Sequence, residues 1–184
     1  VADGIVKIGH DKLAAMFNGV VRCLASQGVF DKDHYVVLDA TDNEATPTYQ
    51  TDDGRDVPHV VRQKRPDVRA NKHSTKVDVR VYGWKVWIVW EPQLKIPLAL
   101  AIDGINEPDN KHAYGVLQAA RRNVEGHARI RSVALDRGFL DGKLLSAIES
   151  DGIRIYIPAK STMHIAKDAR GIARSAAVEV DTHG

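Results

Sequence analysis

Residues 130–139 read Ile-Arg-Ser-Val-Ala-Leu-Asp-Arg-Gly-Phe, a short apolar run that ends on the carboxylate Asp136 and is followed by Gly138. This pattern is typical of a buried strand that delivers an acid to the carboxyl-terminal edge of an α/β sheet, where such sheets place their sites. A second stretch has the same form, because His-Tyr-Val-Val-Leu at 34–38 leads directly to Asp39. These two aspartates are far apart along the chain, so they meet only if their strands lie side by side and parallel.

Composition limits the classes of protein to which the chain can belong. At 184 residues it suits one domain with a core that needs no disulfide, and its single Cys23 favours a reducing compartment. No apolar stretch is long enough to span a bilayer and no signal-peptide pattern is found, so we expect no membrane partner. Residues 55–85 are rich in Lys and Arg, whereas the charged residues of 1–54 are mainly acidic. The basic segment favours binding to a polyanion, and the alternative is that it is a solvated loop with no such role.

Hydrophobic periodicity predicts three helices and five strands. We expect helices at 11–28, 110–126 and 141–152, and strands at 35–41, 76–90, 96–102, 130–136 and 153–157. The helices are expected to be capped by Asp11, Asp109 and Asp141. Three strands without intervening helices, followed by alternating helix and strand, indicate a mixed α/β sheet.

Two further features lie within and between these strands. The polar segment 42–76 has no convincing period and is expected to be a long loop. Trp84, Trp87 and Trp90 could form a base-stacking platform, but their apolar neighbours favour a place in the strand core.

Four short segments occur in a characteristic order: Leu-Asp-Ala-Thr at 38–41, Tyr-Gly-Trp-Lys at 82–85, Ile-Asn-Glu-Pro-Asp at 105–109 and Leu-Asp-Arg-Gly-Phe at 135–139. Together they resemble the DDE transposases of bacterial insertion sequences, over about residues 11–160. The resemblance implies a ribonuclease-H-like domain, an α/β fold with a mixed five-stranded sheet and flanking helices. It also divides the chain into a leading helix packed on or joining the core (1–30), the catalytic core (31–160) and the start of a truncated insertion or final helix region (161–184).

The resemblance implies Asp39 and Asp136 as the first two catalytic acids and as ligands of Mg²⁺ or Mn²⁺. The implied activity is metal-dependent DNA strand cleavage and strand transfer. The family's third acid is a Glu on a later helix. Glu179 and Asp168 match its pattern poorly, so we expect it beyond Gly184 and expect this fragment to be inactive alone.

DNA is the partner that the resemblance implies, both as transposon ends and as target, with a homodimer when the protein is complete and a cytoplasmic, nucleoid-associated location. Candidate phosphate contacts near the site are Arg137 and Lys85, although Lys85 could equally extend out of the sheet into solvent. Asp42 is expected to face away from Asp39 and to be solvated. Candidates for nonspecific backbone binding are the basic residues Arg62, Lys64, Arg65, Arg69 and Lys72.

Other function classes fit less well. A phosphatase with an aspartyl nucleophile would have a second Asp two residues after Asp39, where this chain has Thr41, and no Gly-x-Gly-x-x-Gly motif for a dinucleotide follows a strand. The alternative that stays open is an inactive or domesticated relative that binds DNA or a partner without cutting it.

Overall fold

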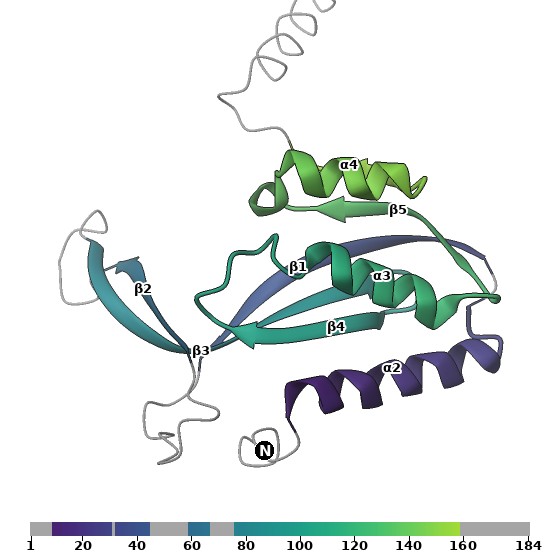
Figure 1. Ribbon diagram of the computed structural model, residues 1–184, viewed down its shortest axis with the longest axis horizontal. Helices are drawn as coiled ribbons and strands as arrows, with labels where there is room; N and C mark the ends of the chain where they lie inside the picture. Colours follow the sequence, from purple (N-terminus) through teal and green to yellow (C-terminus); the bar gives the residue numbers. More distant parts are fainter. Residues whose placement is uncertain (1–8, 31, 45–58, 67–75, 159–184) are drawn as a thin grey trace, which may run out of the picture.

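The computed structural model describes residues 9–30, 32–44, 59–66 and 76–158, with the backbone alone for 59–66 and 76–82. The elements in chain order are α2 (His10–Ser26), β1 (Asp33–Glu44), β2 (His59–Pro66), β3 (Lys76–Glu91), β4 (Ile96–Gly104), α3 (Ala113–Val124), β5 (Arg129–Leu135), a short 3₁₀ helix (Arg137–Phe139), α4 (Gly142–Ser150) and β6 (Arg154–Tyr156) (Figure 1).

The predicted mixed five-stranded sheet is confirmed, in the order β4-β3-β1-β5-β6. The pairs β1/β3 and β3/β4 are antiparallel, whereas β1/β5 and β5/β6 are parallel. The chain passes from β5 to β6 through α4, and it reaches β5 from β1 by way of β2, β3, β4 and α3. Both routes are long enough for the crossover that parallel pairing needs. The prediction of parallel pairing between the strands that carry Asp39 and Asp136 is therefore confirmed.

The expectation of a long loop over 42–76 is wrong at its start and in part of its middle, whereas β3 begins at Lys76 as predicted. β1 continues to Glu44, and β2 pairs antiparallel with the first half of β3 as a sixth strand. After Val60 and Val61, β2 continues as Arg-Gln-Lys-Arg-Pro, so it lacks the alternation of apolar and polar residues that signals a half-buried strand. It forms through backbone pairing with β3, which periodicity does not report.

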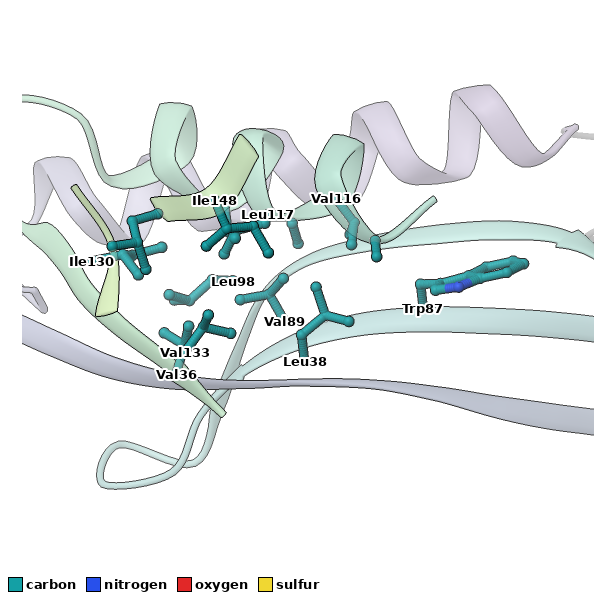
Figure 2. Close-up of a cluster of buried hydrophobic side chains, with 14 of the residues drawn as sticks. Val36, Leu38, Trp87, Val89, Leu98, Val116, Leu117, Ile130, Val133 and Ile148 are labelled. Atoms are coloured by element: carbon teal, nitrogen blue, oxygen red, sulfur yellow. The ribbon is translucent and has the colours of Figure 1, made fainter. Parts of the chain in front are cut away.

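The core lies on one face of the sheet. In β1 the side chains of Val36 and Leu38 are fully buried while Tyr35 and Asp39 on the opposite face are exposed, which follows from the two-residue period of a strand. Figure 2 shows side chains from the helices, Val116, Leu117 and Ile148, facing those of the strands across this core. Of the three tryptophans, only Trp87 is fully buried, and Trp90 is 36 % exposed.

Helix α2 packs against β4 and α3. Asn123 of α3 is buried, and its amide donates to the Leu98 carbonyl (2.8 Å) and to Asn18 Oδ1 of α2 (2.7 Å), which ties the two helices to the sheet edge. The predicted cap is wrong: Gly9 occupies the N-cap position and Asp11 lies in the first turn, where its charge favours the helix dipole. Among the helices of the described residues, none has both the length and the apolarity needed to cross a bilayer.

Gly83 generates a testable prediction about the sheet. It pairs with Glu44 at the end of β1 and with His59 at the start of β2, its φ is +156°, and a Cβ there would clash with the Asn43 carbonyl oxygen. We expect Gly83→Ala to lower the free energy of unfolding by about 2 kcal/mol or more, because backbone atoms must move apart.

The matched control is Gly19→Ala in the middle of α2, where nothing lies within 4 Å of a new Cβ. That change is expected to be neutral or to stabilise by about 0.5–1 kcal/mol. Chemical denaturation of both variants measures the effects, and equal stability of the Gly83 variant and the wild type would contradict the close packing of β1 on β3.

Candidate active site at the ends of β1 and β5

Asp39 and Asp136 follow the last paired residues of two neighbouring parallel strands. Leu38 of β1 lies opposite Leu135 of β5, and each aspartate is the next residue of its chain. The side chains of Leu38 and Leu135 are buried. Both aspartates are exposed. The fold therefore places two carboxylates, distant in sequence, at adjacent positions where the neighbouring strands β1 and β5 end.

Local hydrogen bonds orient each carboxylate. Asp39 Oδ1 accepts from the Ala40 N–H at 2.8 Å, and Asp136 Oδ1 accepts from the Gly138 N–H at 2.6 Å, which caps the 3₁₀ helix Arg137–Phe139. Among the described residues, the second oxygen of each carboxylate accepts no hydrogen bond. Phe139 is buried and anchors the 3₁₀ helix to the core, so the turn that carries Asp136 is held from behind.

The carboxylates of Asp39 and Asp136 suit a hard divalent cation, because such ions prefer oxygen ligands. These ions commonly use one or two carboxylates together with water and phosphate oxygens. In the described part of the chain, no group of three His, Cys, Asp or Glu side chains is arranged to hold a metal ion. The two strand-end carboxylates would thus be part of a coordination shell that water and a phosphate-bearing substrate complete.

Lys85 of β3 lies in a cluster of acidic groups beside this edge. Its ammonium donates to Asp109 Oδ1 and to the Glu107 carbonyl, both at 2.7 Å, and Asp42 Oδ1 is 3.7 Å away. The Lys85 side chain is only 11 % exposed. It therefore neither extends freely into solvent nor presents an unpaired charge, and contact with a DNA phosphate would compete with the Asp109 ion pair.

Asp109 was expected to cap a helix, and that expectation is wrong because α3 begins at Ala113 with His112 at the N-cap position. Asp109 instead fixes the loop after β4: its carboxylate binds Lys85 and its carbonyl accepts from Trp87 Nε1 at 2.6 Å. It also reaches the Asp136 turn. A Cβ on Gly138 would lie 2.8 Å from Asp109 Oδ2 and 2.9 Å from Asp136 Oδ1, so a larger residue at 138 would require one of the two carboxylates to shift.

Asp42 was predicted to face away from Asp39 and to be solvated. It lies opposite Lys85 in the β1/β3 ladder, three residues after Asp39, so it does project from the other face of the strand. The prediction that Asp42 is solvated holds only in part. Its side chain is 37 % exposed, but its carboxylate also lies 3.7 Å from the Lys85 ammonium. Asp141 does cap α4 as predicted, accepting from the Leu144 N–H at 2.9 Å.

Asp103, near the end of β4, is a second carboxylate that binds residues of the loop after β4, namely Lys111 and His112. Burial raises its pKa, but hydrogen bonds from Lys111 (2.8 Å), His112 (2.7 Å) and the Gly104 N–H outweigh burial and hold the pKa well below its ordinary value of 3.8. Hydrogen bonds to Asp103 and Glu107 raise the pKa of the exposed Lys111 ammonium. The sequence did not single out Asp103, and it singled out Asp109 only as a helix cap, because the role of Asp109 depends on Lys85, 24 residues away.

The remaining candidate residues are placed as follows. Arg137 is exposed on the 3₁₀ helix and makes no ion pair within the described residues. Arg62, Lys64 and Arg65 belong to β2, of which only the backbone is described. Candidates that lie outside the described residues are Arg69, Lys72, Asp168 and Glu179.

The Lys85–Asp109 pair can be tested with a double-mutant cycle. Asp109→Asn is expected to lower the free energy of unfolding by about 1–2 kcal/mol, because the largely buried Lys85 charge loses its partner. Lys85→Gln alone is also expected to destabilise. The double variant should cost less than the two single changes together, with a coupling of roughly 1 kcal/mol by urea denaturation. Strict additivity would show that the pair contributes nothing.

Asp103 predicts a pH dependence. A carboxyl whose pKa is lowered by folding stabilises the protein above its unfolded pKa and loses that contribution as the pH falls toward the folded value. We expect Asp103→Asn to cost about 1–2 kcal/mol near neutral pH, and the difference from wild type to shrink steadily from pH 5 to pH 2.5. A difference that stays constant over this range would show that the Asp103 charge is not what stabilises the loop.

Comparison with known proteins agrees with this geometry. Residues 32–183 match the family model described as a transposase DDE domain, a match that covers most of the chain and includes both strand-end aspartates. No curated protein matches the chain at a significant level. The ribonuclease-H-like α/β fold and the resemblance carried by the four sequence segments are thereby confirmed. The chain belongs to the transposase DDE domain family.

Proposed function

We propose that this domain cuts DNA strands and transfers the freed 3′ end to a second DNA, in a reaction that depends on Mg²⁺ or Mn²⁺ and on Asp39 and Asp136. Membership of a transposase family associates the chain with DNA transposition and its nuclease chemistry. The observation that supports the assignment of residues is the parallel register of Leu38 with Leu135, which brings the next residues of both strands to one edge.

Divalent ions, when bound, activate the attacking oxygen and neutralise the leaving oxygen of an in-line phosphoryl displacement. In this proposal Asp39 and Asp136 supply carboxylate oxygens for that purpose. Each keeps one oxygen on a backbone N–H, which fixes the direction of the other, as a preorganised site requires. The buried Leu38, Leu135 and Phe139 hold the two strand ends in place.

Further groups take part in the proposed reaction besides Asp39 and Asp136. No residue of the described chain is assigned here to the third acid of the family pattern. DNA contacts are assigned to Arg137 and Lys85 near the site and to the basic segment that contains Arg62, Lys64, Arg65, Arg69 and Lys72. Transposon ends and target DNA are the substrates, and a homodimer is the active assembly.

Nicking of supercoiled plasmid DNA by the full-length protein tests the proposal. Asp39→Asn and Asp136→Asn are each expected to reduce metal-dependent nicking by about 100-fold or more, because loss of a direct ligand should cost at least as much as loss of a residue that supports one. Removal of divalent ions with EDTA should abolish nicking of the unmodified protein.

Asp141→Asn is the matched control, since it makes the same change at the same edge of the sheet and asparagine still caps α4. It should leave nicking within about twofold of wild type. If both strand-end variants nick DNA as well as the control, the residue assignment is wrong. If the unmodified protein binds DNA but never nicks it with either ion, the alternative of an inactive DNA-binding relative is correct.

A further inference from the structure

A polar groove lies at the end of the sheet opposite Asp39 and Asp136. It has a volume of about 810 Å³, and its walls come from the chain before β1, the first residues of β5, the last turn of α3 and the residues after α4. A smaller hollow of about 410 Å³ shares Asp33, Arg131 and Gly152 with it and adds Arg154. We call the larger hollow, with Lys32, Arg122 and Arg129 in its lining, the basic groove.

Three cations from separate parts of the chain line the basic groove, and none of them has an ion pair among the described residues. Lys32 precedes β1, Arg122 lies in the last turn of α3, and Arg129 opens β5. All three are exposed, and within the described residues none makes a salt bridge or a side-chain hydrogen bond. His127 lines the same space. Arg122 lies in the last turn of α3, where a positive charge is favoured by the helix dipole. Lys32 and Arg129 are not in a helix, so the dipole does not explain why they are in the groove.

Most of the acidic groups in the groove are already neutralised. Asp33 binds Arg131 Nε at 2.8 Å, and Asp151 binds Arg121 Nη1 at 3.0 Å. Burial raises the pKa of Asp151, but hydrogen bonds from Tyr114, Arg121 and Gln118 outweigh it and lower the pKa, so this carboxylate stays ionised in its pair. Glu125 is the only groove carboxylate without an ion pair among the described residues, so the groove keeps an excess of positive charge.

The opposite end of the sheet has the reverse charge. Asp39, Asp136 and the carboxylates around Lys85 gather there, and Lys85 and Lys111 are committed to ion pairs. The two ends are separated by the length of β1 from residue 33 to 39, roughly 20 Å, which exceeds the Debye length of about 10 Å at 0.1 M salt. At the first end the carboxylates outnumber the cations Lys85, Lys111 and Arg137. Without divalent ions, a DNA phosphate is therefore attracted more strongly to the end with the groove.

We propose that the basic groove binds the phosphodiester backbone of DNA without any metal ion, as a contact site separate from the two aspartates. The inference deepens the proposed function, because it assigns a second DNA contact to the same domain. Guanidinium groups bind phosphate oxygens through paired N–H donors, and an open, polar, arginine-rich groove suits a charged backbone better than an apolar ligand.

Fluorescence anisotropy of a labelled 20-base-pair duplex in EDTA tests this directly with the present chain. The variant Lys32→Gln/Arg122→Gln/Arg129→Gln is expected to bind roughly 10-fold more weakly or worse near 0.1 M salt. The slope of log K against log salt should fall by about 2–3, since each phosphate contact contributes about 0.9. Inorganic phosphate at 10 mM should compete poorly, because a single phosphate cannot replace a backbone that spans three cations.

The matched control is Lys12→Gln/Lys95→Gln/Lys143→Gln, which removes the same charge from exposed positions outside the groove. It should change affinity less than about threefold. Circular dichroism checks folding, and the single variant Arg122→Gln, with an expected slope change of about 0.9, serves if the triple variant does not fold.

The proposal is overturned if groove and control variants weaken binding equally, or if only Arg62→Gln/Lys64→Gln/Arg65→Gln in β2 does so. Strong competition by inorganic phosphate would also overturn it, by showing a site for a small anion. Binding is measured in EDTA, where no metal-dependent nicking takes place, so a failure of the nicking assay leaves this test intact.

Discussion

The parallel pairing of β1 with β5 is the constraint on which the rest of the structure depends. It sets Leu38 beside Leu135 in the core and thereby places Asp39 and Asp136 side by side at the edge. A shift of one residue in this register would turn the side chains of one strand to the other face and expose its apolar set. Burial of the leucines thus stabilises the fold and fixes the position of the acids at the same time.

Charge is separated along the strand direction. The carboxyl ends of the strands carry acidic groups, some of them neutralised by Lys85 and Lys111, whereas the amino ends carry unpaired cations in the basic groove. A sheet arranged in this way attracts divalent cations to one end and phosphates to the other. If both proposals hold, metal ions and DNA bind first at different places, and a bound cation reduces the repulsion between the acidic end and a phosphate.

The sequence correctly predicted features that depend on residues close together in the chain. Asp141 caps α4 through its own N-terminal turn, and the apolar runs before Asp39 and Asp136 identified both central strands. The sequence did not reveal β2, which forms by backbone pairing and has a basic second half. It also misassigned Asp109, whose partner Lys85 lies 24 residues away and comes close only through the fold. The catalytic roles of the aspartates stay predictions.

The most direct measurement of the central claim is an anomalous difference map from a crystal of this chain soaked in Mn²⁺. The account predicts a peak bonded to carboxylate oxygens of both Asp39 and Asp136, at the edge where β1 and β5 end. A Mn²⁺ peak elsewhere with none between the two aspartates, or carboxylates too far apart to share one ion, would contradict it.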